Sequence, residues 1–83
     1  MKHELDRTRP IWRQIAEIIT DRIASDTYPV GSRVPPVVEL SAEFGVATST
    51  VQKAFLHLKQ EGILRGEVGL GTFVTALPET PGR

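Results

Sequence analysis

The chain contains no cysteine, and no run of apolar residues approaches the length of a membrane span. The missing cysteines exclude disulfides and thiolate metal sites, which fits a reducing compartment. The first ten residues also lack the apolar segment of a signal peptide. We therefore expect a cytoplasmic protein with no membrane partner.

An excess of charge of either sign is also missing, because ten Lys and Arg residues balance ten Asp and Glu residues. This neutrality counts against strong binding of nucleic acid, whose affinity comes largely from neutralised phosphates. The charges are unevenly distributed, however. Between residues 44 and 60 the only charged residues are Lys53 and Lys59. We expect a mildly basic segment on a neutral domain, and weak binding by a single copy.

With 83 residues, 40% of them hydrophobic, the chain can form one small core but not a core around an enclosed substrate cavity. No Ser–His–Asp or paired-carboxylate constellation has a pocket to occupy, so we expect no catalytic residues. His3 and His57 are far apart in sequence and have no companion ligands. We therefore expect no metal and no other cofactor.

Hydrophobic periodicity predicts three helices. The first has Pro10 as its first helical residue and ends near 24–26. The second covers 37–44 and is ended by Gly45, and the third covers about 48–61 and is ended by Gly62. The third helix has its inward residues at i, i+3, i+4 and i+7, namely Val51, Ala54, Phe55 and Leu58.

Three strands are expected around these helices: a short one at 32–34, and two at 63–65 and 72–75 that flank a glycine-rich hairpin at 66–71. The resulting order is that of a winged helix-turn-helix, an α+β fold that is mainly α. The predicted organisation is a flexible N-terminus at 1–9, a winged-helix domain at 10–75, and a linker or tail at 76–83.

The third helix is the candidate reading element, because it follows a tight turn at 44–47 and opens on small hydroxyl residues. Short side chains at Thr48, Ser49 and Thr50 let its N-terminus approach a phosphate. Gln52 can bind the edge of adenine, and Lys53 can add a phosphate contact. The alternative is that the hydroxyl groups only cap the helix and that Gln52 is merely solvated.

The hairpin at 66–71 lacks the Gly-Lys-Ser/Thr ending of a nucleotide-binding loop. Its glycines can let the backbone approach a minor groove, with Arg65 as the best cation at its base; the alternative is a plain turn. Arg33 can reach a phosphate or form an ion pair with Glu39 or Glu67. Trp12 is expected to pack the first helix against the wing side of the core.

In this order the sequence resembles the DNA-binding domain of the GntR family of bacterial transcription regulators. The resemblance covers Pro10 to Val74 and rests on six segments: Pro10–Ile15, Pro29–Pro36, Glu39–Ser41 with Phe44–Val46, Thr50–Ala54, Glu61–Gly62 and Gly69–Val74. It implies groove-facing residues at Ala47, Thr48, Ser49, Thr50, Gln52, Gly69, Leu70 and Gly71. Val38, Ala47, Thr48 and Leu70 depart from the family pattern, and cationic contact is thinner than usual.

The resemblance implies sequence-specific binding of double-stranded DNA by a repressor or activator. Two copies would bind a palindromic operator, with the third helix in the major groove and the wing near the minor groove. Family members also carry a C-terminal domain that binds a small-molecule effector and forms the homodimer, and it is missing from this chain. The alternative is a winged-helix module for protein–protein contact, which would not show the steep salt dependence of DNA binding.

Overall fold

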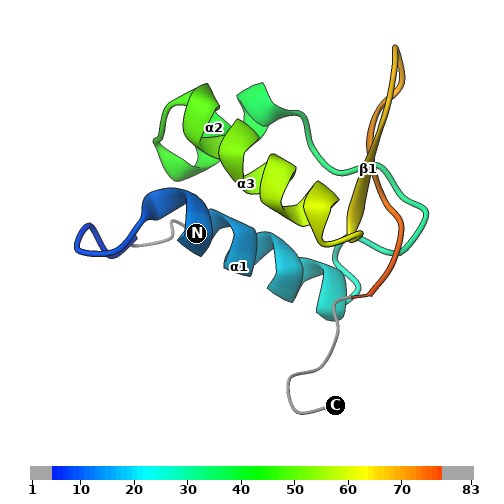
Figure 1. The fold of residues 1–83 in the computed structure, drawn as a ribbon, viewed down its shortest axis with the longest axis horizontal. Helices are drawn as coiled ribbons and strands as arrows, with labels where there is room; N and C mark the ends of the chain where they lie inside the picture. The colour runs from blue at the N-terminus through cyan, green and yellow to red at the C-terminus, as the bar shows by residue number, and fades with distance from the viewer. Residues whose placement is uncertain (1–4, 78–83) are drawn as a thin grey trace.

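The apolar stripes of the sequence fold into three helices and one hairpin in the computed structural model, which describes residues 5–77. In Figure 1, α1 runs beneath α3, α2 lies against the first part of α3, and the hairpin rises beyond the end of α3. This arrangement confirms the winged helix-turn-helix fold. The elements are α1 (Ile11–Ala24), α2 (Val37–Phe44), α3 (Thr48–Gln60), β1 (Leu64–Glu67) and β2 (Gly71–Val74).

Helix α1 begins one residue later than expected. Pro10 is its N-cap, because a ψ of 126° places it outside the helical region, and Ile11 is the first helical residue. The helix ends at Ala24, within the expected range. Its inner face, which includes Ile15, Ile19 and Ile23, is completely buried against the other helices.

Gln14, the one polar residue buried among residues 5–77, ties the segment before α1 to the helix. Its Oε1 accepts the Asp6 N–H at 2.7 Å, and its Nε2 donates to the Asp6 carbonyl at 2.5 Å. Leu5 packs against the core beside it. Residues 5–9, which the sequence assigned to a flexible N-terminus, are thus held in place. Residues 1–4 and 78–83 lie outside the described part of the chain.

The turn between α2 and α3 follows the expected chemistry. Gly45 caps α2 in the left-handed region at φ 66°, which glycine adopts without a steric penalty. Val46 is half-buried and packs against the core, as expected for a residue that plugs the turn. Ala47 is the N-cap of α3. The turn therefore fixes the angle at which α3 leaves α2.

A single core joins the helices and the sheet. It contains the inner residues of α1 and α3 together with Leu40 and Phe44 of α2. Val74 of β2 packs into the same core from the sheet. At about 25 cal/mol per Å² of apolar surface, side chains of this size each contribute about 1.5–3 kcal/mol when buried. The buried residues are Ile15, Ala16, Ile19, Ile23, Tyr28, Val34, Leu40, Phe44, Val51, Ala54, Phe55, Leu58, Ile63, Leu64 and Val74.

Arg22 links α1 to α2. Its guanidinium donates to the Tyr28 hydroxyl at 2.6 Å and to Glu43 Oε1 at 3.2 Å, and a second donor forms a short bond to Glu43 Oε2. The same group lies over the rings of Tyr28 and Phe44, at 5.7 and 5.5 Å from their centroids. This cation therefore belongs to the scaffold.

The hairpin is longer and its turn shorter than expected. Strands β1 and β2 pair in an antiparallel register from Leu64↔Val74 to Glu67↔Gly71, so only residues 68–70 form the turn. The sequence had placed the whole of 66–71 in the turn. The expected strand at 32–34 is reduced to a single bridge between Arg33 and Phe73. Pro35 follows directly and has no N–H with which to extend the ladder.

The chain leaves the sheet beside the end of α3. Thr75 donates its backbone N–H to the Ile63 carbonyl at 2.8 Å and its hydroxyl to the Gly62 carbonyl at 2.7 Å. Gly62, at φ 78°, follows the last turn of α3 and ends the helix as expected. Within residues 5–77, no helix combines the length and apolar character needed to cross a bilayer.

Candidate nucleic-acid interface

The outer face of α3 is exposed to solvent. Val51, Ala54, Phe55 and Leu58 are buried, as the periodicity predicted. Between them the helix presents a continuous exposed face that carries hydroxyl, amide, cationic and apolar groups. Its exposed residues are Thr48, Ser49, Gln52, Lys53, Leu56, Lys59 and Gln60.

The N-terminus of α3 also faces solvent. Ala47 has no side-chain acceptor, and no side-chain hydrogen bond caps the helix. The first N–H groups of an α-helix have no partner inside the helix, and here the cap leaves them open as well. Thr48 and Ser49 are exposed and Thr50 is half-buried. The hydroxyl groups therefore do not cap α3, which contradicts that part of the alternative, whereas Gln52 is exposed to solvent as the alternative also held.

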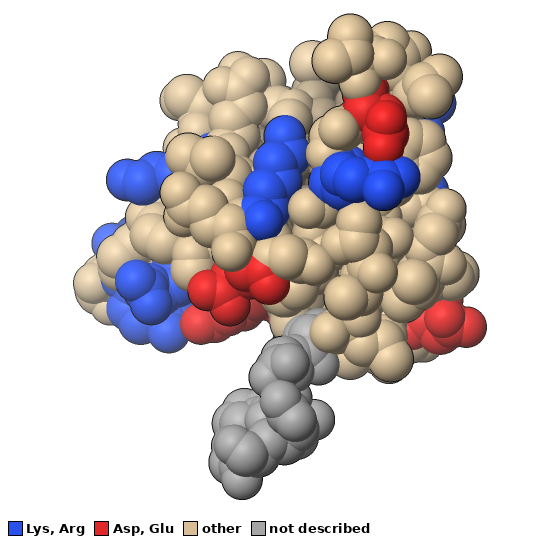
Figure 2. Space-filling view, turned by 45° about the vertical axis from the view of Figure 1, so that its right-hand side comes forward, with Lys and Arg blue, Asp and Glu red and all other residues tan. Residues whose placement is uncertain are grey.

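Basic side chains over residues 5–77 fall into two groups. Arg9, Arg22 and Arg65 form ion pairs with carboxylates. The other basic residues in this range form no ion pair. On the face shown in Figure 2, basic side chains lie in separate patches, and acidic groups lie beside some of them. The residues without an ion pair are Arg7, Arg13, Arg33, Lys53 and Lys59.

Two of these unpaired cations lie against the wing. A Cβ atom on Gly66 would lie 3.2 Å from Lys59 Nζ, so the lysine runs along the start of the hairpin. A Cβ atom on Gly71 would lie 2.8 Å from Arg33 Nε, so the Arg33 side chain lies against the start of strand β2. Among the described residues Arg33 forms neither of the ion pairs considered for it. Its charge remains available for a phosphate.

Arg65 was expected to be the best cation of the wing, but its charge is partly compensated. Its Nε lies 2.6 Å from Glu67 Oε2, on the same strand. Lys59 and Arg33 are better placed, because they reach the hairpin from α3 and from the segment before α2. An exposed pair of this kind contributes little stability, so a phosphate can still compete for Arg65.

The tip of the wing is apolar and exposed. Val68 is fully exposed and Leu70 is 62% exposed, and Gly69 between them has a φ of 79°. The Leu70 N–H donates to the Glu67 carbonyl at 3.0 Å and closes the turn. Gly71 has a φ of 119°, a region that side-chain-bearing residues rarely adopt. The tip can therefore contact sugar or base surfaces, but it adds no charge.

Lys53 lies on the border of α3 that faces α1. Its Nζ is 5.4 Å from the centroid of the Trp12 ring, which also contacts the His57 ring edge-on at 5.2 Å. Trp12 was expected to pack against the wing side of the core. The structure instead places it against α3, because the start of α1 lies beneath this helix and the wing lies at its far end (Figure 1).

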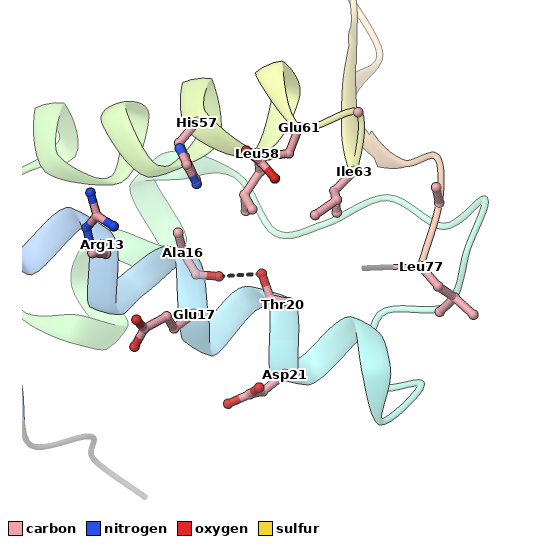
Figure 3. Close-up of a pocket in the computed structure, with 12 residues that line it drawn as sticks. Arg13, Ala16, Glu17, Thr20, Asp21, His57, Leu58, Glu61, Ile63 and Leu77 are labelled. Carbon is pink, nitrogen blue, oxygen red and sulfur yellow. Dashed lines mark hydrogen bonds between the residues drawn. The ribbon is translucent and has the colours of Figure 1, made fainter. Parts of the chain in front are cut away.

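A hollow of about 410 Å³ lies away from the outer face of α3, between α1 and the end of α3. Its floor includes Ala16, Leu58 and Ile63, and Figure 3 shows carboxylates at its rim. The Thr20 hydroxyl is already bonded to the Ala16 carbonyl at 2.8 Å. No three His, Asp or Glu side chains converge to hold a metal within the described residues.

Sequence reasoning named most of this face as contact residues but missed Leu56, Lys59 and Gln60. Lys59 and Leu56 lie on the same side of α3 as Gln52, at i+7 and i+4, a spacing that could have identified them. Arg13 lies next to Trp12 and became a candidate only when the packing of Trp12 was known. Leu56, 56% exposed, is suited to contact a thymine methyl group.

The fold and the exposed outer face of α3 together define a winged helix-turn-helix domain whose recognition helix, α3, is accessible to a ligand. A model of the bacterial regulatory proteins of the gntR family matches residues 12–74. The chain belongs to this family. It is therefore the DNA-binding part of a bacterial transcription regulator, and the matches do not favour the alternative of a protein-contact module.

Curated relatives agree with this family. The chain is 38% identical over 66 residues to the mannosyl-D-glycerate transport/metabolism system repressor MngR of Escherichia coli, covering 80% of this chain and 28% of that protein. It is 34% identical over 65 residues to the histidine utilization repressor of Klebsiella aerogenes, covering 78% and 27%. The chain thus spans 27–28% of the length of these two relatives.

Solved structures show the same fold. A GntR family transcriptional regulator from Listeria monocytogenes matches with a TM-score of 0.83 and 31% identity, over 86% of this chain and 62% of that one. The DBD of AraR in complex with operator ORX1 matches with a TM-score of 0.78 and 30% identity, over 90% and 92%. The second comparison supplies a relative of the same size bound to its operator.

Proposed function

We propose that this chain reads a DNA operator with α3 in the major groove and the wing over the adjacent minor groove. The observation that carries the proposal is the outer face of α3. It is open along its whole length, holds Gln52 and small hydroxyl groups, and has unpaired cations on both borders. A helix placed in the major groove has phosphates on both sides, so this charge pattern suits it.

The roles of the residues follow from their places on this face. Gln52 reads a base edge, since an amide can bind adenine N6 and N7 together. Ala47, Thr48, Ser49 and Thr50 bring the open end of α3 close to a phosphate. The wing residues Gly69, Leu70 and Gly71 approach the minor groove. The phosphate contacts come from Arg33, Lys53 and Lys59, with Arg65 in a weaker role.

A single domain offers few phosphate contacts, so we infer that two copies bind a palindromic site together. The full regulator would hold them together through a domain that follows the linker and binds a small-molecule effector. The larger size of the curated relatives supports this inference. The proposed role needs no catalytic residue or cofactor, and it places the protein in the cytoplasm with the chromosome.

Selection of bound duplexes from a random DNA pool tests the proposal. We expect the selected pool to converge on a short half-site, because Gln52 and its neighbours discriminate among bases. Gln52→Ala should then weaken binding to that site by about 1–3 kcal/mol and relax the preference at one position. Fluorescence anisotropy of labelled duplexes measures both effects.

Gln60→Ala is the matched control, because Gln60 is an exposed amide near the other end of the same helix. We expect it to change the affinity by less than Gln52→Ala. A pool that never converges, or equal effects of the two substitutions, would contradict the assignment of Gln52 as a base reader.

A further inference from the structure

Trp12 brings together cations from two helices. The Lys53 ammonium of α3 lies 5.4 Å from the centroid of its ring, and the Arg13 guanidinium of α1 lies at 5.1 Å. Both distances fall within the range of cation–π attraction, about 6 Å. The His57 ring contacts the same indole edge-on at 5.2 Å. The ring is therefore held between the helices with one cation from each.

A hollow opens beside this ring. It measures about 320 Å³ and is lined by Ile11, Trp12, Ser49, Thr50 and Lys53. One wall is aromatic and aliphatic, and the opposite wall carries two hydroxyl groups and an ammonium. The hollow is at the border of the exposed face of α3, on the side opposite the wing. It thus lies where one edge of a bound groove would pass.

The Lys53 ammonium at this hollow is not neutralised by any of the described residues, and Arg13, which contacts the same ring, lines the larger hollow between α1 and the end of α3 instead. Among residues 5–77, Lys53 and Arg13 form no ion pair. Glu17, one turn further along α1, is paired with Arg9 at 3.9 Å. The lining side chains are donors and apolar groups without a carboxylate. Such a set favours an anion with several acceptor oxygens, and a phosphodiester is the anion that DNA supplies.

We propose that Trp12, Lys53 and the Ser49 and Thr50 hydroxyls form a binding site for a backbone phosphate of DNA. In this site Lys53 and the hydroxyls contact the phosphate. Trp12 is a positioning residue that holds the Lys53 ammonium toward α1 instead of leaving its flexible stem free. The inference rests on the proposed function, since α3 must lie in a groove for a phosphate to reach this hollow.

The energetic reason is the cost of ordering a lysine. A free lysine side chain loses up to about 2 kcal/mol of conformational entropy when it is fixed in one contact. A cation that already rests on an aromatic ring has lost part of this freedom before DNA arrives. Trp12 should therefore increase the contribution of Lys53 to DNA binding without touching DNA itself.

A double-mutant cycle between Trp12 and Lys53 tests this coupling. The probe is a short duplex of arbitrary sequence, because a phosphate contact does not depend on the bases. Binding is measured by anisotropy of the labelled duplex over a series of KCl concentrations. The logarithm of the binding constant K falls linearly with the logarithm of the salt concentration. Removing one phosphate contact reduces the magnitude of this negative slope by about 0.9, and a lower slope below means a shallower one.

We expect Lys53→Met to reduce the magnitude of the slope by about this amount. Arg13→Met, which removes the cation beside the other hollow, should reduce it by less. Trp12→Leu should lower both affinity and slope, whereas Trp12→Phe, which keeps an aromatic face, should retain most of them. In the Lys53→Met background, Trp12→Leu should have little further effect. Arg9→Met is the matched control, because Arg9 is already paired with Asp6 and Glu17.

A structural role alone predicts a different outcome. Thermal unfolding of Trp12→Leu and Trp12→Phe shows what each costs in stability, and the salt slope is then compared at temperatures where both are folded. Additive effects of Trp12→Leu and Lys53→Met would overturn the positioning role. A slope that is unchanged in Lys53→Met would overturn the phosphate site.

The tryptophan itself gives a second readout, because the sequence contains only one. We expect duplex binding to change the Trp12 emission, and Lys53→Met to remove most of that change. Binding seen by anisotropy with constant emission would contradict the site while leaving the proposed function intact. No binding of any duplex, including the selected operator, would contradict the proposed function instead.

Discussion

Arg22 and Lys53 are two cations that rest on aromatic rings between helices, but their surroundings differ. Arg22 lies over Tyr28 and Phe44 and is also hydrogen-bonded to Glu43, and the Glu43 bond raises the pKa of the arginine. Lys53 lies over Trp12 and has no carboxylate partner among the described residues. The first cation links α1 to α2, and the second lies between α1 and the exposed face of α3.

The difference shows that net charge describes this domain poorly. Several of its basic residues are used inside the scaffold or paired on the surface, where acidic residues cancel them. The cations without such partners include Lys53, Lys59 and Arg33, which border α3 and the wing. A neutral chain can therefore present a basic face, provided that its acidic residues are engaged elsewhere. Two substitutions test this division, and a third probes a residue outside it.

Arg22→Met should have the largest effect on folding. It leaves Glu43 without its guanidinium partner and the Tyr28 hydroxyl without its donor. Breaking a fully buried ion pair costs roughly 3–5 kcal/mol, and Glu43 is partly exposed, so we expect a loss of about 2 kcal/mol. Urea denaturation measures it. The salt dependence of DNA binding should not change, and a lower slope without lost stability would place Arg22 among the DNA-binding cations.

Lys59→Met should have the opposite profile. Its ammonium runs along Gly66 toward the wing and has no acidic partner in the described chain. We expect the slope of log K against log salt to fall by about 0.9, and the free energy of unfolding to change by less than about 0.5 kcal/mol. Arg65→Met is the matched control, since Glu67 already compensates Arg65. If Lys59→Met and Arg65→Met changed the salt slope equally, the division between cations with and without a carboxylate partner would be contradicted.

Asp6 should give the smallest effect, because it is an exposed acid on the surface before α1 and not one of these cations. Hydrogen bonds from the Thr8 hydroxyl and backbone N–H lower the pKa of Asp6 below 3.8. A lowered folded-state pKa contributes stability above the unfolded value, and this contribution is lost as the pH falls through the folded value. Thermal unfolding at neutral pH and below pH 3.8 should show a slightly smaller acid-induced loss for Asp6→Asn than for the unmodified protein.

The fold could be predicted from the sequence because its signals are local. Apolar spacing in the segments of α1 and α3, and glycines at positions 45 and 62, depend on residues within a few positions of one another. The hairpin could be located but not its register, because the shorter turn depends on pairing between Glu67 and Gly71. Likewise, the segment at 32–34 had the composition of a strand, but its neighbours allow a single bridge.

The candidate site could be predicted only in part. The exposed positions of α3 follow from the helical period, so Gln52 and its neighbours were found. The engagement of each cation depends on partners from other elements. Glu43 meets Arg22 across 21 positions, and Trp12 meets Lys53 from a different helix. No local pattern contains these contacts, which is why Trp12 was assigned to the wrong side and Arg13 was missed.

The two hydrogen bonds of Thr75 have a mechanical consequence. They fasten the departing chain to the Ile63 and Gly62 carbonyls, immediately after the last turn of α3. A torque applied to the chain beyond this point would act on the end of the recognition helix before it reached the wing tip or α2. The direction in which the chain leaves the domain is thus tied by these two bonds to the end of the helix that carries the reading face.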